Sequence, residues 1–294
     1  MLLLDSGNLF PASGSNRKQI AETALKAMGL MDYGAMNLGW SDLSLGTDFF
    51  EEMRSTITFP LITSNLVHKD SRLPYGKKYV IKTIGDVRVG ILGVMPLNSI
   101  YQKAVPPGDG SCPQNRHKSA DHEHAQEKKA PFTDQLEIIP PGNALKNLVP
   151  EVRTRADIVI LLSQCGFDAT TLLVDNVDGI DLAISGPSRT RRSGKSKVPI
   201  IETGYIGKRM GSVKLTSDGA GWIIKAGDEM MISLNDRIPY DSSVIKITSD
   251  DIDKKIRDEE LQKMKKEAEA LFKLTPYEYY EMLIKEQSEA QEKK

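Results

Sequence analysis

The chain has 294 residues, of which 39% are apolar, and its formal charge at pH 7 is −1. This length and apolar content predict a folded protein of one large or two modest domains. The near balance of acidic and basic residues excludes a general electrostatic attraction to nucleic acid or to an anionic membrane, so we expect no nucleic-acid partner.

Simple features of the sequence bear on membrane and redox chemistry. No apolar run approaches the roughly 20 residues of a membrane span. The opening MLLLDSG lacks the basic head and the length of a signal peptide, but because this start looks truncated, the missing signal excludes nothing. Two cysteines, Cys112 and Cys165, are too few for a disulfide framework or a paired Cys-x-x-Cys metal site. The sequence leaves the redox compartment open.

Short apolar runs stopped by Gly, Asn or Asp recur along most of the chain, a pattern typical of buried strands. In chain order they are MLLLD, AMNLG, FPLITSNLV, YVIKTIG, VRVGILGVM, ADIVILLSQ, IDLAISG, VPIIETG and MGSVKLT. Helices are expected between them at residues 17–28, 45–54 and 144–155. The alternation predicts an α/β layered fold whose ligands bind at the carboxyl ends of the strands.

Residues 105–133 interrupt this pattern with a polar stretch that has almost no apolar anchors, and we interpret it as an exposed, partly disordered insertion. It contains Cys112 and three histidines, His117, His122 and His124. Their spacing fits no standard zinc finger, so a specific metal site is not expected there.

Beyond residue 249 the sequence predicts a helical tail. One stripe of this tail collects Ile252, Ile256, Leu261, Met264, Ala268 and Leu271. A second helix restarts at Thr275, with Pro276 at its first position. Because such an amphipathic tail must pack on something, we expect a domain at residues 1–235 followed by a linker and helical extension at 236–294.

The strand-end loops resemble the metallophosphoesterase domain of the 5'-nucleotidase family, the calcineurin-like phosphoesterases. LLLDSGN is similar to the family's L-L-D-A-G-D, and DYGAMNLGWSDLSLG is similar to its Y-D-A-M-x-L-G-N-H-E-F-D-x-G. The later runs follow in family order to about Thr216. The resemblance implies a four-layer α/β/β/α metallophosphoesterase-like sandwich, with a helical C-terminal extension in place of the family's nucleotide-binding second domain. It also implies that the family's first strand, with its D-x-H motif, is missing here.

The resemblance fails at the positions that bind metal. The family holds two divalent metals with a bridging Asp, an Asn and several His residues, and uses them to activate water against a phosphoryl group. The bridging Asp of the family falls on Asn8, its Asn on Trp40 and the catalytic His on Ser41. The His of L-S-H-x-G falls on Gln164, and the two His of G-H-x-H fall on Pro187 and Arg189.

Each replacement weakens or removes a metal ligand. A neutral Asn8 lacks the charge that holds two dications together, Trp40 offers only an N–H donor, and Arg189 places a permanent cation where a metal should sit. Only Asn8, Asp42 and Gln164 remain as weak oxygen ligands. We therefore expect no metal cofactor and no catalytic residues.

The favoured hypothesis is a non-catalytic metallophosphoesterase homologue that acts as a structural or interaction subunit and meets a protein partner through its C-terminal helices. One alternative is an active metal-dependent phosphoesterase that uses Asp5, Asn8, Asp42 and Gln164 with a pair of Mn, Zn or Fe ions. Another is an anion-binding module in which the basic loop, with Arg189, Arg191 and Arg192, binds phosphate or sulfate.

Three single residues carry competing interpretations. Trp40 fills the emptied metal pocket or stacks on a base or sugar, and Asp42 caps a turn or survives as an acid. Cys165 follows a buried strand and reads as a small core residue rather than a nucleophile. SDGAGW, which ends at Trp222, reads as a turn between strands. Because proteins of the resembled family are usually exported, we expect an extracytoplasmic location.

Overall fold

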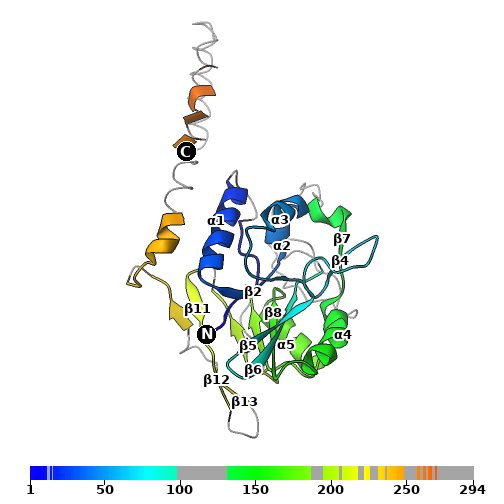
Figure 1. Cartoon of the computed structure of the whole chain (residues 1–294). Helices are drawn as coiled ribbons and strands as arrows, with labels where there is room; N and C mark the ends of the chain where they lie inside the picture. The colour runs from blue at the N-terminus through cyan, green and yellow to red at the C-terminus, as the bar shows by residue number, and fades with distance from the viewer. Residues whose placement is uncertain are drawn as a thin grey trace, which may run out of the picture. The chain divides into compact units, whose positions relative to one another are not determined.

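A computed structural model describes most of the chain. The described residues are 1–97 apart from 12, 13 and 15, then 131–186, 195–204, 207–217, 222–225, 231–235 and 237–247, with a few short pieces between 257 and 269. The chain divides into two compact units, Met1–Asp241 and Ser242–Lys294. The sheets described below all belong to the first unit (Figure 1).

The first sheet is parallel and contains β1 (Leu3–Asp5), β2 (Tyr33–Asn37) and β3 (Leu61–Ile62) in that order. The helix α1 (Arg17–Leu30) connects β1 to β2. Two short helices, α2 (Trp40–Leu43) and α3 (Thr47–Met53), lie between β2 and β3. All the carboxyl ends of this sheet therefore lie at one edge.

The second sheet has five strands in the order β10-β9-β8-β6-β5, and only β5 runs antiparallel to its neighbour. Their bounds are β5 (Tyr79–Ile84), β6 (Val87–Val94), β8 (Ile158–Ser163), β9 (Leu182–Ser185) and β10 (Ile200–Glu202). Every residue of β8 is buried, as its unbroken apolar sequence predicts for a strand covered on both faces.

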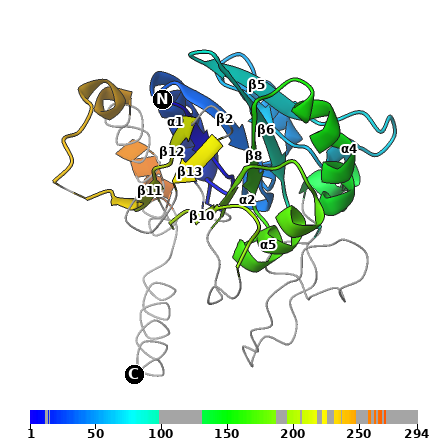
Figure 2. The ribbon, with the colours of Figure 1, turned by 90° about the horizontal axis from the view of Figure 1, so that it is seen from below.

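Three apolar clusters separate the layers. One lies between the first sheet and α1, α2 and α3, and includes Leu25, Met36 and Phe49. A second joins the two sheets, where Ala35 and Ile62 pack with Ile91. The third lies between the second sheet and the helices α4 (Pro141–Arg153) and α5 (Phe167–Asn176). This gives the predicted α/β/β/α order, and Figure 2 shows α1 on one side of the strands and α4 and α5 on the other.

Three two-stranded antiparallel pairs complete the first unit. They are β4 (Leu66–His68) with β7 (Leu136–Ile138), β11 (Arg209–Gly211) with β14 (Met231–Ser233), and β12 (Lys214–Ser217) with β13 (Trp222–Lys225). A 3₁₀ turn, η1 (Pro131–Asp134), precedes β7. The pairing of β12 with β13 fits the predicted turn before Trp222, although residues 218–221 lie outside the described residues.

Several element boundaries differ from the sequence predictions. The helix expected at 45–54 begins two residues later, as α3, because Gly46 precedes it with a φ of 91°, which is not a helical conformation. The run FPLITSNLV forms two short strands, β3 and β4, instead of one. Between them Thr63, Ser64 and Asn65 turn their polar side chains to buried backbone groups, which ends the first strand.

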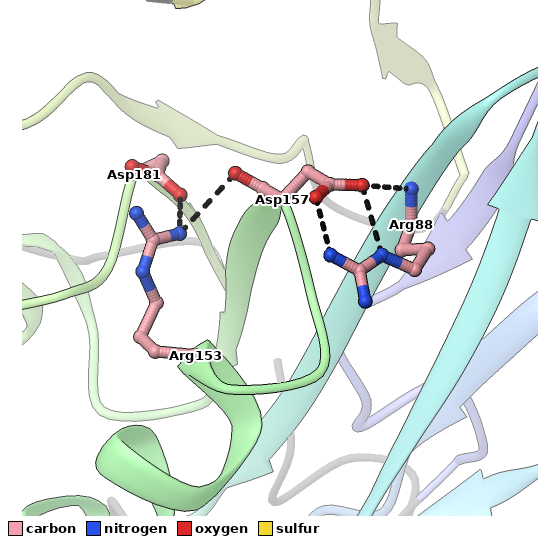
Figure 3. A network of polar contacts seen from close by, with 4 residues as sticks. All are labelled: Arg88, Arg153, Asp157 and Asp181. Carbon is pink, nitrogen blue, oxygen red and sulfur yellow. Dashed lines mark hydrogen bonds and ion pairs between the residues drawn. The ribbon is translucent and has the colours of Figure 1, made fainter.

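A network of charged side chains holds the amino ends of the central strands together (Figure 3). The Arg88 guanidinium donates to both oxygens of Asp157, at 2.7 and 3.1 Å, and the Arg88 backbone N–H donates to the same carboxylate at 2.8 Å. Arg153 donates to Asp181 at 2.6 Å, and Asp181 also accepts from the backbone N–H of Val159 at 2.7 Å. These contacts fix β6, β8 and the start of β9 relative to one another.

The second unit is helical at residues 242–247 and at the described residues between 257 and 269. Two members of the predicted apolar stripe are described, and both are exposed, Leu261 by 50% and Met264 by 66%. The other members of the stripe and the helix expected from Thr275 lie outside the described residues. The helical C-terminal extension therefore stays a prediction.

Candidate functional site

Three loops from distant parts of the chain meet at the carboxyl ends of β1, β2 and β8. Asn8 follows β1, Asp42 lies in α2 after β2, and Gln164 follows β8. The Asn8 side-chain amide donates to Oε1 of Gln164 at 2.9 Å, and the Asn8 backbone N–H donates to Oδ2 of Asp42 at 2.7 Å. The structure thus brings together these three residues, which the sequence pattern singled out.

Asp42 is fully buried, and its carboxylate is bonded on both oxygens by the backbone. It accepts from the N–H groups of Asn8 at 2.7 Å, Gly39 at 2.8 Å and Phe10 at 3.0 Å. Burial raises the pKa of Asp42 from 3.8 to about 7, although these three backbone hydrogen bonds act in the opposite direction. Asp42 therefore caps its own helix and fastens the loop after β1 to the loop after β2.

The polar atoms of the Asn8 side chain are all used within the site. Its Oδ1 accepts from the backbone N–H of Ser41 at 2.9 Å and from the Ser41 hydroxyl at 3.1 Å, while its amide donates to Gln164. Asn8 has a φ of 57°, in the left-handed region that Asn tolerates better than most residues. A Cβ on Gly39 would lie 2.2 Å from this Oδ1, so only Gly fits there.

Gln164 extends the network toward β1. Its Nε2 donates to the carbonyl of Gly7 and, at 3.5 Å, to the hydroxyl of Ser6. The Gln164 residue is 6% exposed, and a Cβ on Gly186 would lie 2.7 Å from its Nε2. Gln164 is therefore packed as an interior side chain that bridges two loops.

Trp40 is held by a hydrogen bond and by an aromatic contact. Its indole N–H donates to the carbonyl of Pro96 at 2.9 Å, and its ring meets Phe132 edge to face with centroids 5.0 Å apart. The Trp40 side chain packs against the apolar cluster on the helix side of the first sheet. This arrangement favours the pocket-filling interpretation of Trp40 over stacking on a base or sugar.

Asp5 adds a second acidic group near the centre of the site. Its Oδ1 accepts from the Gly7 backbone N–H at 2.7 Å, and burial raises its pKa above the usual 3.8. Its charge also raises the pKa values of Asp42 and Tyr33, in each case less than burial does. The half-buried carboxyl group of Asp5 and the fully buried one of Asp42 thus influence each other at the end of the first sheet.

Two buried asparagines also belong to this edge, although sequence reasoning missed them. Asn37 donates to the carbonyls of Ser6 and Val94, both at 3.0 Å, and so ties the two sheets together. Asn65 donates to the Met95 carbonyl at 2.8 Å and accepts from the Met95 N–H at 3.1 Å. Their place within short apolar runs could have identified them, because an Asn buried in such a run needs backbone hydrogen-bond partners.

Some predicted site residues lie outside the described residues. These are Pro187, Arg189, Arg191, Arg192, Cys112, His117, His122 and His124. Of the basic loop, Lys197 is described, and its ammonium donates to the Asp175 carbonyl at 2.5 Å and forms an ion pair with Asp178 at 3.5 Å. Lys197 therefore contacts the C-terminal end of α5 and the residues after it.

Cys165 packs beside the apolar cluster under α4 and α5, as a small core residue would. Its sulfur is disulfide-bonded, which the sequence did not predict. The sequence could not reveal the bond because two cysteines alone give no framework pattern.

The described side chains of this site are amide, hydroxyl and carboxyl groups that bond to one another and to nearby backbone. Within the part of the chain that the structure describes, no group of three or more His, Cys, Asp and Glu residues is placed to hold a metal ion. The side-chain oxygens of Asn8, Gln164 and Asp42 already accept hydrogen bonds. Oε1 of Gln164 accepts from the Asn8 amide, and Oδ1 of Asn8 accepts from the Ser41 N–H. Oδ1 of Asp42 accepts from the Phe10 N–H. This set of three residues offers two amide oxygens and one carboxylate, whereas two closely spaced dications are usually held by several imidazole and carboxylate ligands.

Comparison with known proteins supports the fold and shows a distant relationship. The chain is 22% identical to bovine 5'-nucleotidase over 274 residues, which cover 83% of the chain and 42% of that relative. It therefore spans about two fifths of the length of the curated relatives it matches. No protein-family model matches the chain.

Solved structures match over a similar share of the chain. The Thermus thermophilus sulfate thiohydrolase SoxB has a TM-score of 0.62 at 21% identity, covering 84% of this chain and 41% of SoxB. The calcineurin-like phosphoesterase YfkN of Bacillus subtilis has a TM-score of 0.61 at 19% identity, covering 83% of this chain and 80% of YfkN. The chain has a mixed α/β fold that matches metallophosphoesterase structures, and it is a distant relative of the 5'-nucleotidases by sequence.

Proposed function

We propose that this chain is a non-catalytic relative of the metallophosphoesterases that works as a structural or interaction subunit. The observation that carries the proposal is the closed hydrogen-bond network of Asn8, Ser41 and Gln164. On the resemblance given above, these residues stand at positions where the family places metal ligands and a catalytic His. Here they bond to one another.

The state of Asp42 supports the same proposal. Three backbone N–H groups occupy its oxygens, and a metal ion would have to displace them. Each displaced N–H would become an unsatisfied buried donor, which costs about 1–3 kcal/mol. Metal capture at Asp42 would therefore disrupt the two loops that it joins.

The proposal is tested by metal analysis and hydrolysis assays on the same purified sample. We expect no stoichiometric manganese, zinc or iron by elemental mass spectrometry, and no metal-dependent hydrolysis of a phosphomonoester or a nucleoside 5'-monophosphate. Stoichiometric metal together with turnover that disappears in an Asp42→Ala variant would establish the alternative of an active hydrolase with an atypical site.

The partner is proposed to bind through the C-terminal helices. Leu261 and Met264 support this, since both expose large apolar side chains in a segment patterned as an amphipathic helix. Affinity purification from the native source should recover a partner with the wild-type chain and lose it with Leu261→Asp/Met264→Asp. Gln262→Asp on the same segment serves as the matched control, because Gln262 is outside the apolar stripe. Equal recovery with all three proteins would contradict a role for the stripe.

An extracytoplasmic location is part of the same proposal. The disulfide at Cys165 supports it, because disulfides persist mainly in oxidising compartments. Among the residues that the structure describes, none of the helices has the length and apolar content needed to cross a bilayer. Fractionation of the native cells tests the location, and recovery of the protein with Cys165 as a free thiol in the cytosol would overturn it.

A further inference from the structure

The ribbon formed by β11 and β14 covers the core of the first unit with one of its two faces. Its strands run antiparallel, with Gly211 opposite Met231 and Met210 opposite Ile232. Met231 packs against the apolar cluster that joins the two sheets, and a Cβ on Gly211 would lie 2.7 Å from the Ile201 side chain. The face that carries Gly211 and Met231 is therefore the inner face of the ribbon.

The outer face of this ribbon carries large apolar side chains that are open to solvent. Because successive residues of a strand point to opposite faces, Met210 and Ile232 lie on the outer face. Leu234 joins them, since its N–H donates to the Lys208 carbonyl at 2.9 Å and continues the ladder. The exposed fractions of Met210, Ile232 and Leu234 are 39%, 41% and 42%. The solvated face of an antiparallel pair normally carries polar side chains, so this apolar face is suited to contact with another molecule.

The described charged residues around this outer face are cations. Lys208 lies opposite Leu234 on the face itself. The described charged residues at 207–217 and 231–237 are all exposed, and they are Lys208, Arg209, Lys214 and Arg237. Asp236 lies outside the described residues. In the part of the chain that the structure describes, none of these four cations forms an ion pair. The outer face thus combines apolar side chains with neighbouring positive charge.

We propose that the outer face of the β11–β14 ribbon binds an amphipathic helix of a partner protein whose apolar stripe is bordered by Asp and Glu. A helix commonly covers the apolar face of a sheet, and its side chains at i, i+3, i+4 and i+7 would contact Met210, Ile232 and Leu234. Carboxylates at the borders of the stripe would pair with Lys208 and Arg237. The apolar centre supplies the buried contact, and the cations select an acidic partner over a basic one.

Charge also favours a partner helix over a second copy of this chain. Two copies in contact through the same face would bring Lys208 and Arg237 of one copy near those of the other, and like charges oppose such a contact. The surface belongs to the unit Met1–Asp241, whereas Leu261 and Met264 belong to the other unit. The proposal therefore goes beyond the proposed function, and it stands or fails independently of the C-terminal helices.

Synthetic helical peptides of about 18 residues, or five turns, test the chemistry of the partner on the full chain. The first peptide has a Leu stripe bordered by Glu, the second has Lys in place of Glu, and the third has the residues of the first in scrambled order. Fluorescence anisotropy of the labelled peptides measures their binding. We expect the Glu-bordered peptide to bind about tenfold more tightly than the other two, and more weakly as salt rises. Equal binding of all three, or binding of none, would overturn the proposal.

Oxidation of methionine by dilute peroxide shows where the peptide binds, without any variant. Met210 should be oxidised in the free chain and protected by the Glu-bordered peptide. Met31, which is 42% exposed at the end of α1, should be oxidised equally in both states. Protection of Met210 in the free monomer would show that another segment of the same chain covers the face. Protection that depends on protein concentration would show that a second copy covers it, and either result would overturn the proposal.

Two substitutions on the outer face separate its apolar contacts from general stickiness. Ile232→Thr and Leu234→Thr keep a residue that suits a strand but remove apolar surface, so each should weaken binding of the Glu-bordered peptide by about tenfold. Leu73→Thr is the matched control, because Leu73 is 63% exposed outside the ribbon, and it should bind the peptide as wild type does. Circular dichroism checks that all three variants are folded. Wild-type affinity in both ribbon variants would show that this face is not the binding surface.

Discussion

Replacing Asp42 by Asn should change how the stability of the protein depends on pH. Asp42 is fully buried, and burial raises its pKa from 3.8 to about 7. In the unfolded chain the same carboxyl group titrates near its ordinary value. Between these two pKa values the folded protein holds a proton at Asp42 that the unfolded chain has released.

The sign of the effect follows from this difference in bound protons. Stability falls with rising pH wherever the folded state binds more protons than the unfolded state. The contribution of Asp42 is therefore fully present below about pH 4 and is lost as the pH rises through about 7. A shift of about three pH units corresponds to a loss of about 4 kcal/mol for an isolated group. Asp5, whose pKa burial also raises, acts in the same direction and remains in the variant.

Urea unfolding at pH 4, 5, 6, 7 and 8 measures this effect. The free energy of unfolding of wild type, compared with that of Asp42→Asn, should fall by up to about 4 kcal/mol across this range. Asp86→Asn, a change at an exposed carboxyl group in the turn between β5 and β6, is the control and should follow wild type. Parallel curves for wild type and Asp42→Asn would show that Asp42 is not titrating as a buried acid, and the reasoning would be refuted.

Three further substitutions test other contacts of the fold and site by urea unfolding. Gly39→Ala places a Cβ 2.2 Å from Oδ1 of Asn8, and should cost roughly 1–3 kcal/mol because the Asn8 side chain must leave its partners; an unchanged midpoint would contradict the network. Trp40→Phe keeps the ring contact with Phe132 but removes the donor to the Pro96 carbonyl, so the free energy of unfolding should fall by about 1 kcal/mol. A rise in the free energy of unfolding would show that the indole N–H is dispensable. Asp157→Asn removes a carboxyl group whose pKa the Arg88 hydrogen bonds hold down at about 2, so the variant should lose less stability than wild type as the pH falls from 4 to 2.

The sequence predicted the layers of the fold correctly, but it did not predict where a strand breaks. Apolar runs such as that of β8 predict buried strands because burial on both faces requires an unbroken apolar sequence. FPLITSNLV looked like one strand by the same rule. It breaks at Thr63, Ser64 and Asn65, whose side chains find backbone partners that only the folded chain supplies.

The candidate site was predictable in its location but not in its bonding. Asn8, Asp42 and Gln164 could be placed at one edge because each follows or lies near the end of a strand. Their mutual hydrogen bonds depend on loop conformations such as the φ of 57° at Asn8, which no periodicity encodes. Asn37 and Asn65 were missed for the same reason, since Asn37 reaches the Val94 carbonyl of the second sheet and Asn65 reaches the Met95 carbonyl that follows β6.

The network also predicts that restoring one acidic residue will not restore a metal site. Asn8→Asp would replace the amide that donates to Oε1 of Gln164 by a carboxylate oxygen, and two acceptors would then face each other at 2.9 Å. The new charge would also lie close to the buried Asp42, whose carboxylate the Asn8 backbone already contacts. Both effects disfavour the folded state, by roughly 1–3 kcal/mol at pH 7.

Because one of the two carboxyl groups can take up a proton more easily at lower pH, the loss in Asn8→Asp should shrink at pH 5. Urea unfolding at both pH values measures this loss, and Asn8→Ala separates it from the simple removal of the amide. Adding manganese should not reverse the loss, because Trp40 still supplies a donor to Pro96 and Gln164 still bonds the Gly7 carbonyl. Stoichiometric manganese binding that stabilises Asn8→Asp would show that the edge is a metal site lacking one charge, and that the network does not replace the metals.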